Sequence, residues 1–304
     1  MANMTVRDLL ETIPKDETIY YRSNPGNAGD ALIAAGTFHL LDNLQLNFEF
    51  INPTKFDATN KIVIYAGGGN FNHIYPDAAD FISKHHRFAK KLILLPHTIT
   101  GNEELLSRLG NNCILFSREE ISADHINKFA VNCINYIDHD MAFHLDIEKI
   151  KPLNKLSTLS LVVRKIGMQL INSEKRHQIP TLKRLLKIIR FELVEFGKNY
   201  YVNGNFFRVD VEASGFPVPK GNFDLSRMYE FGTQNREIIE LTVSKLLTHI
   251  DKFSKINTDR LHICIAAGFL GKDVYFFGNS YFKCRAVFEH SISSRFKNVT
   301  WTTR

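Results

Sequence analysis

The feature that most constrains the fold is an alternation of apolar and amphipathic segments along the first half of the chain. Residues 61–66 (KIVIYA) are nearly all apolar, which is typical of a strand buried on both faces of a parallel sheet. Strands are expected at residues 18–22, 47–51, 61–66, 91–95 and 113–116, and helices at residues 31–41, 76–90, 103–109 and 119–129. Alternating strands and helices predict parallel strand–helix–strand units and therefore an α/β fold. Pro96 is expected to end the fourth strand.

The second half of the chain resumes this pattern after a break. Residues 146–156 (DIEKIKPLNKL) are charged and contain Pro152, and a length of 304 residues favours two domains. We therefore expect domains at residues 1–150 and 151–304, with the last helix packing back on the first domain. Strands are expected at residues 158–163, 255–257 and 274–277, and helices at 181–189, 233–250, 259–269 and 286–296. Residues 197–222 have weak periodicity, so irregular structure or a small insertion is expected there.

Composition excludes several classes of protein. Hydrophobic residues make up 44% and charged residues 23%, the values of an ordinary soluble protein. The four cysteines are scattered, which argues against a zinc site or a disulfide framework. The N-terminus lacks the apolar region of a signal peptide, and no apolar run reaches the ~18 residues of a membrane span. These features predict a cytoplasmic protein with reduced cysteines.

Positive charge is concentrated in one segment. Residues 151–190 contain ten Lys or Arg and one acidic residue, whereas the whole chain has a net charge of +6. Two interpretations fit: a solvated helix face, or a surface for phosphates or anionic lipid headgroups. The second would place the protein peripherally at the inner face of a membrane. No nucleic-acid-binding motif accompanies this charge, so no nucleic-acid partner is expected.

The segment TDRLH at residues 258–262 is the strongest candidate for chemistry. It follows a strand and opens an apolar helix, so Thr258 or Asp259 is expected to cap a helix N-terminus that attracts anions. Arg260 offers a planar fork of donors to a carboxylate or phosphate, and His262 can transfer a proton near neutral pH. The alternative is a purely structural helix start, in which Arg260 pairs with an acid and His262 packs.

Two glycine-containing turns follow strands of the first half. The triplet Gly67, Gly68 and Gly69, followed by Asn70, lets the backbone approach a ligand closely at the carboxyl end of a buried strand. It is neither a Walker A loop nor a dinucleotide-binding motif. The turn NAGD at residues 27–30 is the corresponding turn after the first strand. The alternatives are a plain tight turn for the glycines and a helix cap for Asp30.

Arg118 follows another strand of the same sheet and is expected to point to the same edge. Its alternative role is an ion pair with Glu119 or Glu120. The segment DHD at residues 138–140 is not expected to bind a metal, because adjacent residues alternate in direction along a strand. The aromatic residues Tyr200, Tyr201, Phe206 and Phe207 fit either a sugar-binding platform or a small core under a loop.

Taken in order along the chain, these segments resemble the motifs of the polysaccharide pyruvyl transferase family. The matching segments are residues 27–30 (NAGD), 67–70 (GGGN), 95–98 (LPHT), 117–119 (SRE) with Ser122, 140–143 (DMAF), 258–262 (TDRLH) and 279–283 (NSYFK). His97 stands where many members carry Gln. Residues 191–222 match no segment of the family.

The resemblance implies two Rossmann-like domains in a GT-B-like arrangement with an interdomain cleft. It implies that phosphoenolpyruvate, as a co-substrate, donates its enolpyruvyl group to a sugar of a surface polysaccharide or of its lipid-linked precursor. The product is a pyruvate ketal, phosphate is released, and neither a metal nor another cofactor is expected. It further implies that His262 is the general acid and that Arg260 and Arg118 hold the donor from different domains.

Further donor-site residues follow from the same motifs. They are Asn27, Gly29, Asp30, Gly67, Gly68, Gly69, Asn70, Asp259, Asn279, Ser280 and Lys283. Asp30 or Asp259 is expected to accept the hydroxyl proton. The main alternative function is a GT-B-type glycosyltransferase that uses a nucleotide sugar, although such enzymes usually carry a glutamate for the ribose and residues 258–269 contain none. A non-catalytic carbohydrate-binding protein is a further alternative.

Overall fold

The computed structural model describes residues 4–53, 55–150 and 201–303. The predicted basic segment 151–190, the strand at 158–163, the helix at 181–189 and Tyr200 lie outside the described residues. By their internal contacts, the residues group into two units. The first comprises Met1–Pro25, Leu32–Asp146 and Phe282–Arg295, and the second comprises Gly26–Ala31, Ile147–Tyr281 and Phe296–Arg304. The expected boundary between residues 150 and 151 stays a prediction.

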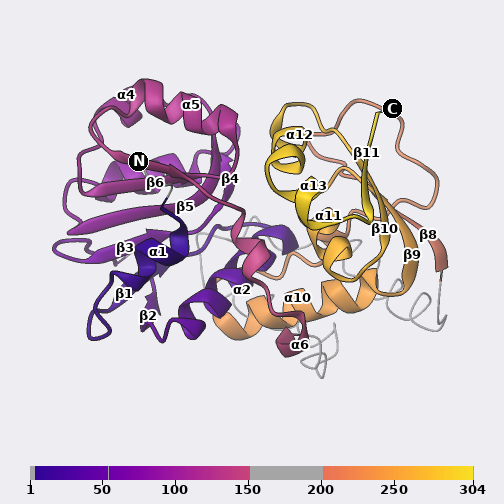
Figure 1. Cartoon of the computed structure of the whole chain (residues 1–304), viewed down its shortest axis with the longest axis horizontal. Coiled ribbons are helices and arrows are strands. Elements are labelled where there is room, and N and C mark those ends of the chain that lie inside the picture. Colours follow the sequence, from indigo (N-terminus) through magenta and orange to yellow (C-terminus); the bar gives the residue numbers. More distant parts are fainter. Residues whose placement is uncertain (1–3, 54, 151–200, 304) are drawn as a thin grey trace. The chain divides into compact units, whose positions relative to one another are not determined.

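The first unit is built on a parallel sheet (Figure 1). Its strands in the described residues are β1 (Ile19–Arg22), β2 (Phe48–Phe50), β3 (Ile62–Tyr65), β4 (Gly68–Phe71), β5 (Lys91–Ile99), β6 (Cys113–Ser117) and β7 (Ile134–Ile137). They are ordered β2-β1-β3-β5-β6-β7, with β4 paired to β5. Every residue of β3 is buried, as its apolar sequence predicted. The α/β class is therefore confirmed.

Helices alternate with these strands. They are α1 (Val6–Glu11), α2 (Ala28–Asn43), α3 (Asp77–His85), α4 (Glu103–Ser107), α5 (Glu120–Phe129) and a 3₁₀ turn at Met141–His144. In α1, Thr5 and Asp8 form a reciprocal capping box, which satisfies amides that the helix leaves unpaired. Glu119 caps α5 by accepting a hydrogen bond from the Ser122 N–H (3.0 Å). A further helical run comprises α12 (Lys283–Val287), a π-helical turn (Phe288–Ile292) and α13 (Ser293–Arg295).

Strand β5 differs from the expectation, because it continues through Pro96 to Ile99. Its pairing with β6 shifts register between Leu94 and His97, so the proline that cannot donate lies at an irregularity of the ladder. The expectation that Pro96 ends the strand was wrong. The glycine triplet also differs from a plain tight turn, because Gly68 begins the extended strand β4.

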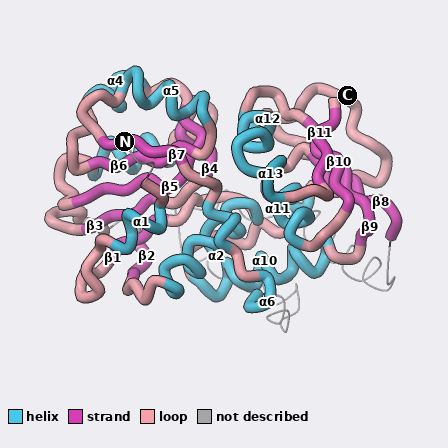
Figure 2. The backbone as a smooth tube through the Cα atoms, viewed as in Figure 1, coloured by secondary structure: helices cyan, strands magenta, loops and turns pink. Residues whose placement is uncertain are grey.

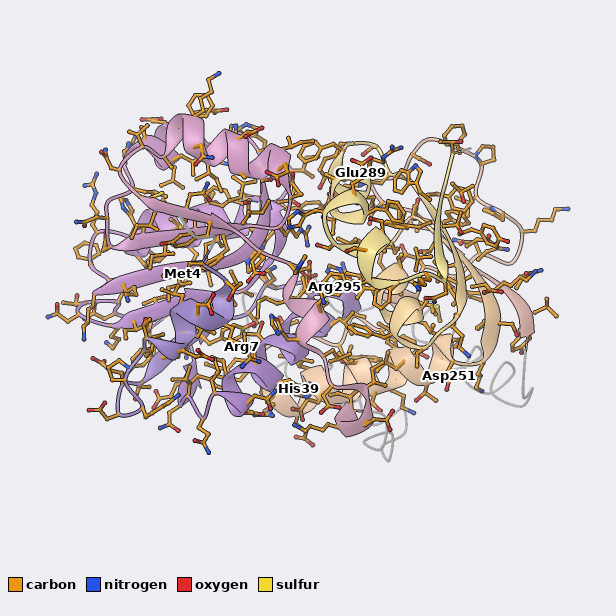
Figure 3. All side chains as sticks on the ribbon, viewed as in Figure 1. Met4, Arg7, His39, Asp251, Glu289 and Arg295 are labelled. Atoms are coloured by element: carbon orange, nitrogen blue, oxygen red, sulfur yellow. The ribbon has the colours of Figure 1, made fainter. Side chains whose placement is uncertain are left out.

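Aromatic packing accounts for part of the unusual phenylalanine content of 24 residues. Tyr21 of β1, Phe38 of α2, and Phe48 and Phe50 of β2 form a cluster with ring centroids 5.2–6.0 Å apart. Beyond this cluster, His39 of α2 accepts a hydrogen bond from the backbone N–H of Asp146 (2.8 Å; Figure 3). This side chain therefore links α2 to the backbone at Asp146.

The second unit holds a smaller parallel sheet (Figure 2). Its described strands are β8 (Tyr201–Phe206), β9 (Phe253–Thr258), β10 (Asp273–Phe277) and β11 (Val299–Thr302), ordered β11-β10-β9-β8. Its described helices are α6 (Ile147–Ile150), α9 (Leu225–Met228), α10 (Arg236–Ile250) and α11 (Leu261–Phe269). The expectation of irregular structure within residues 197–222 was wrong for residues 201–206, which form β8, whereas residues 207–222 contain no strand or helix, as expected.

The two faces of this smaller sheet differ. Phe206, Ile256 and Phe276 are fully buried on the face toward the helices, and α11 packs on β9 and β10. The neighbouring Asn257 and Tyr275 point to the opposite face, where Tyr275 is 42% exposed. The carboxyl ends of these strands therefore adjoin an apolar layer on one side and a polar, accessible face on the other.

The remaining global expectations concern cysteines and membranes. None of the four cysteines forms a disulfide within the described residues, as predicted. Burial raises the pKa of Cys113 to about 11 and that of Cys133 to about 12, which leaves both protonated at neutral pH. Within the part of the chain that the structure describes, no helix has the length and hydropathy of a membrane span.

Candidate functional site

The glycine triplet brings the backbone against two polar side chains of the first unit. Gly68 has φ +147°, and a side chain there would overlap the Asn24 amide. Asn24 Nδ2 donates to the Gly67 carbonyl (2.6 Å), which holds the start of β4 against the end of β1. Gly69 is required for another reason, because a Cβ there would lie 2.9 Å from Nη2 of Arg118.

Arg118 is a buried cation held from one side. Its Nη1 donates to Asp140 Oδ2 (2.6 Å), its Nε donates to Thr98 Oγ1 (2.9 Å), and its side chain is 1% exposed. Neither Glu119 nor Glu120 is its partner, contrary to the alternative considered from sequence. In the described part of the chain, Nη2 makes no hydrogen bond and lies over Gly69. The Lys283 side chain approaches the same glycine. This arrangement offers cationic N–H groups beside a bare stretch of backbone.

His97 supports the same strand edge. Its Nε2 accepts a hydrogen bond from the Asn70 backbone N–H (3.1 Å), and the Asn70 amide in turn donates to the Tyr65 hydroxyl (3.1 Å). Complete burial lowers the pKa of His97 to about 3, so the ring is neutral at physiological pH. Asn70 is therefore positioned through a neutral imidazole, and His97 acts structurally.

The DHD segment has other partners than a metal. Asp138 accepts hydrogen bonds from the backbone N–H groups of Val6 and His139, both at 2.7 Å. Asp140 is taken by Arg118, and His139 Nδ1 lies 2.8 Å from the Ser291 hydroxyl. Among the described residues, no group of three or more potential metal ligands is found.

In the second unit, the start of α11 is anchored by its arginine. The N-cap residue is Arg260, which makes no side-chain cap, so the expectation that Thr258 or Asp259 caps the helix was wrong. Thr258 instead accepts a hydrogen bond from the Arg260 backbone N–H (3.0 Å) and donates to the Phe206 carbonyl (2.7 Å). These bonds join β8, β9 and the first turn of α11.

The Arg260 guanidinium binds two carboxylates. Nε donates to Asp224 Oδ1 (3.0 Å), and Nη2 donates to Asp210 Oδ2 (2.8 Å) and to Asp224 Oδ2. The side chain is 7% exposed, and its pairing with acids is what the structural alternative for this arginine predicted. Nη1 nevertheless has no hydrogen-bond partner within the described residues. Arg260 therefore resembles Arg118: each guanidinium is held on one side by at least one acid, and each has one terminal nitrogen with no partner among the described residues.

Sequence reasoning missed the acids around Arg260. Asp210 and Glu212 also pair with Arg208, whose backbone N–H donates to Asp259 Oδ1 (2.8 Å). Burial opposes the ionisation of Asp210, but hydrogen bonds from Arg208 and the charges of both arginines lower its pKa to about 2. Burial raises the pKa of Asp259. The signal available in the sequence was the presence of acids in the one loop without assigned function, since a buried arginine requires such partners.

His262 meets the turn that follows β1. Asn27 Oδ1 accepts from the Gly29 N–H (2.8 Å), and Asp30 Oδ2 accepts from the Asn27 N–H (2.9 Å), which is a reciprocal cap of α2. Asp30 is thus a capping residue, as its alternative predicted. A Cβ on Gly29 would lie only 2.6 Å from Nδ1 of His262. Residues 232 positions apart in the chain, Asp30 and His262, therefore belong to one local constellation.

The motif at 279–283 is divided between the units. Ser280 donates its backbone N–H to the Glu212 carbonyl (3.0 Å), and the Tyr281 hydroxyl donates to Glu212 Oε1 (3.0 Å). Both polar side-chain atoms of Asn279 are buried without a partner in the described part of the chain. Lys283 lies in the first unit. The sequence-predicted residues thus form two sets, one around Gly69 and Arg118 and one around Arg260 and His262.

Comparisons with known proteins cover most of the chain. A family described as polysaccharide pyruvyl transferase matches residues 27–281. A Bacillus subtilis protein provisionally named the pyruvyl transferase EpsO is 31% identical over 160 residues, 45% of this chain and 48% of that protein. The chain thus matches about half the length of that relative. A crystal structure of a functionally uncharacterised Klebsiella pneumoniae protein is 26% identical, covering 98% of this chain and 97% of that one, with a TM-score of 0.73.

Proposed function

Since the chain belongs to the polysaccharide pyruvyl transferase family, we propose that it transfers the enolpyruvyl group of phosphoenolpyruvate to a sugar. The acceptor would be a sugar of a surface polysaccharide or of its lipid-linked precursor. The product would carry a pyruvate ketal that bridges two sugar hydroxyls, with release of inorganic phosphate. The observation that best supports this proposal is the pair of buried arginines, each anchored by carboxylates and each with one terminal nitrogen unpaired in the described part of the chain.

The donor explains why such arginines are useful. Phosphoenolpyruvate carries a carboxylate and a phosphate, and guanidinium groups bind both kinds of anion. The Asp140 carboxylate fixes Arg118, and two aspartates fix Arg260, so little side-chain entropy is lost when the remaining nitrogen binds. Lys283 beside Gly69 adds a second cation to the set in the first unit.

The reaction balances in two additions at C2 of the donor. The first sugar hydroxyl forms a C–O bond at C2 while C3 gains a proton from the imidazolium of His262, and the hydroxyl proton restores the acid. The second hydroxyl then forms the other C–O bond at C2 as the bond to phosphate breaks, and phosphate leaves with that proton. Asp259, whose pKa burial raises, is better suited than the capping residue Asp30 to take up a hydroxyl proton and pass it on to His262 or to the leaving phosphate.

The test measures phosphate release from phosphoenolpyruvate with synthetic and lipid-linked glycoside acceptors, together with the mass of the product. We expect acceptor-dependent release and a product heavier by pyruvate less one water. His262→Ala should reduce turnover to a low residual level while phosphoenolpyruvate still protects the protein against heating. Arg260→Lys should weaken that protection, and Arg236→Lys is the matched control, because Arg236 is a partly exposed arginine at the start of α10 that also pairs with an acid. The proposal would be refuted if no acceptor gave phosphate release and phosphoenolpyruvate did not protect the protein against heating.

The lipid-linked acceptor and peripheral membrane contact form the part of the proposal that rests on charge. The basic residues between 151 and 190 supply the positive charge for anionic headgroups. Flotation with vesicles of neutral and of anionic phospholipid tests this contact. Binding that requires anionic lipid and disappears at high salt is the expected result, and equal flotation with both vesicles contradicts it.

A further inference from the structure

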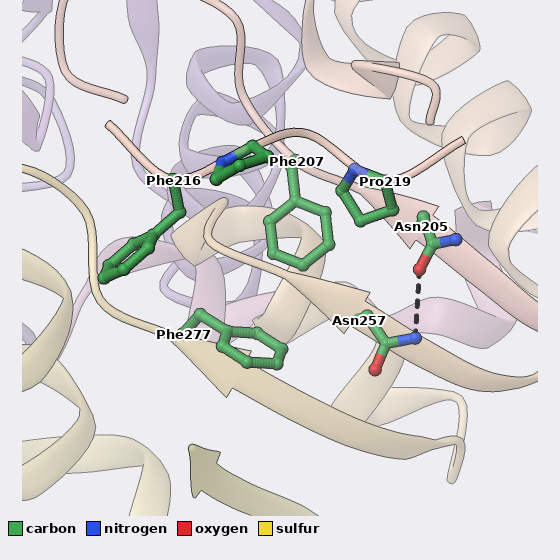
Figure 4. Close-up of a pocket in the computed structure, with 7 residues that line it drawn as sticks. Asn205, Phe207, Phe216, Pro219, Asn257 and Phe277 are labelled. Atoms are coloured by element: carbon green, nitrogen blue, oxygen red, sulfur yellow. Dashed lines mark hydrogen bonds between the residues drawn. The ribbon is translucent and has the colours of Figure 1, made fainter. Parts of the chain in front are cut away.

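A pocket of about 370 Å³ opens in the second unit, outside the residues assigned to the proposed reaction (Figure 4). Its aromatic lining comes from Phe207, Phe216 and Phe277, and the side chains of Asn205 and Asn257 lie next to each other beside these rings. Asn205, Asn257 and Phe277 stand at the carboxyl ends of β8, β9 and β10, where α/β sheets bind ligands. The volume is within the range of about 300–1,000 Å³ for small-molecule sites.

One wall of the pocket is the loop at residues 207–222, whose two ends are joined by hydrogen bonds. At its base, Asn222 Oδ1 accepts from the Phe207 backbone N–H (2.7 Å), and Asn222 Nδ2 donates to the Phe207 carbonyl (3.0 Å). Pro217 and Pro219, which also line the pocket, restrict the backbone near its tip. A closed, proline-restricted loop is partly organised before a ligand arrives, which reduces the entropy lost on binding.

The two amides present hydrogen-bonding groups in a defined combination. Asn257 Nδ2 donates to Asn205 Oδ1 (3.1 Å), and within the described residues neither side chain makes another hydrogen bond. One amide nitrogen and one amide oxygen of the pair are therefore left to bind a ligand. This holds whichever of the two asparagines donates to the other. A donor next to an acceptor complements hydroxyl groups, because each hydroxyl both donates and accepts.

The lining selects against anions and flat bases. Among the described residues that line the pocket, none is charged, so a phosphate or carboxylate would lose its hydration there without a cationic partner from these residues. The rings of Phe207 and Phe277 are tilted by 57° with centroids 5.3 Å apart, so they contact each other and leave no parallel slot between them for a nucleobase. A sugar ring fits better, because its C–H groups can rest on an aromatic face while its hydroxyls reach amides.

We propose that this pocket binds a neutral sugar ring of the acceptor glycan, an inference that rests on the proposed function for its link to catalysis. The loop that forms its wall also carries Asp210, one of the carboxylates that hold Arg260. Asn257 lies three residues before Arg260 on the same strand-to-helix connection. The sugar pocket and the anchored arginine therefore share both of their supporting segments.

The first experiment measures sugar binding without turnover. Saturation-transfer NMR of the full chain uses neutral methyl hexosides and methyl N-acetylhexosaminides as probes, with adenosine and inorganic phosphate for comparison. We expect binding of at least one neutral glycoside, weakened about tenfold in Phe216→Ala and about fivefold in Asn205→Ala, the latter from loss of one hydrogen bond. Val218→Ala changes an exposed residue of the same loop outside the pocket and should bind like the wild type.

The outcomes separate this proposal from the proposed function. No binding of any neutral glycoside at tens of millimolar, unchanged binding in both pocket variants, or stronger binding of adenosine would overturn the sugar assignment. Protection against heating by phosphoenolpyruvate is measured on the same samples and should not change in Phe216→Ala. Sugar binding that depends on Phe216, together with absent phosphate release, would retain the pocket and refute the transfer reaction. Acceptor-dependent phosphate release whose acceptor KM is unchanged by Phe216→Ala would support the transfer reaction and refute the sugar pocket.

Discussion

Gly29→Ala should disable His262 without disturbing the fold. Gly29 lies in the first turn of α2, where alanine normally stabilises a helix relative to glycine by about 0.5–1 kcal/mol. The added Cβ would stand 2.6 Å from His262 Nδ1, whereas ordinary contacts begin near 3.4 Å. The imidazole must therefore retreat by about 0.8 Å. A displacement of about 1 Å at a reacting group can cost about 100-fold in rate, or about 2.7 kcal/mol of activation free energy.

The assay for this variant is acceptor-dependent phosphate release under saturating phosphoenolpyruvate. We expect kcat to fall about 100-fold, while the melting temperature and the protection by phosphoenolpyruvate stay near wild type. The control is Gly36→Ala on the same helix, where a Cβ would overlap the Met141 backbone carbonyl. That variant should lose stability, because its obstacle is backbone that cannot move aside as a side chain can.

A double-mutant cycle separates the effect on His262 from any other effect of Gly29→Ala. If the alanine acts only through the imidazole, it should have no further effect on residual turnover in the His262→Ala background. Wild-type kcat in Gly29→Ala would refute the reasoning, as would an equal fall in turnover with and without His262.

Three further predictions concern the carboxylates that hold the two buried arginines and the buried histidine His97. Asp140→Asn leaves Arg118 buried without its carboxylate and should lower the free energy of unfolding by about 3 kcal/mol in urea titrations, clearly more than Asp138→Asn. Asp210→Asn removes one anchor of Arg260 and should raise the KM for phosphoenolpyruvate several-fold, whereas Glu240→Gln, which loosens the partly exposed Arg236, should not. With a pKa of about 3 in the folded state and 6.5 unfolded, His97 makes the unfolded state bind more protons between these values. Stability should therefore fall by about 2 kcal/mol from pH 7 to pH 5, and His97→Gln should remove that part of the pH dependence; identical pH profiles for the two proteins would contradict the burial argument.

The strands of the fold were predictable where one local pattern dominated. The apolar run of β3 is buried on both faces, and such a run has few other uses in a soluble chain. Prediction was wrong for β5 at Pro96 and missed β7, whose four residues are only partly buried or exposed. In both cases the neighbouring strand decides the outcome: a register shift accommodates the proline, and pairing with β6 extends a segment of weak pattern.

The sequence predicted which types of residue form the candidate site, but it did not predict which acids pair with its arginines. Glycines, arginines and a histidine at strand ends indicated anion binding and proton transfer before any coordinates. Asp140, 22 positions from Arg118, lies in the DMAF segment, but nothing in that segment marks it as the partner of this arginine. Asp210 and Asp224, 50 and 36 positions from Arg260, lie outside every motif. A buried guanidinium implies that a carboxylate exists nearby, but only the folded chain identifies which one.

The sequence by itself determined the α/β class, the strand ends that carry polar residues and the family to which the chain belongs. These follow from short-range patterns, because apolar periodicity and glycine or arginine at a strand end act over a few residues. Tertiary structure alone decided that Gly29 makes room for His262, that each arginine keeps one unpaired nitrogen in the described residues, and that three phenylalanines meet two asparagines in a pocket. These features depend on contacts between residues far apart in the chain, and packing selects such contacts only when the whole unit folds.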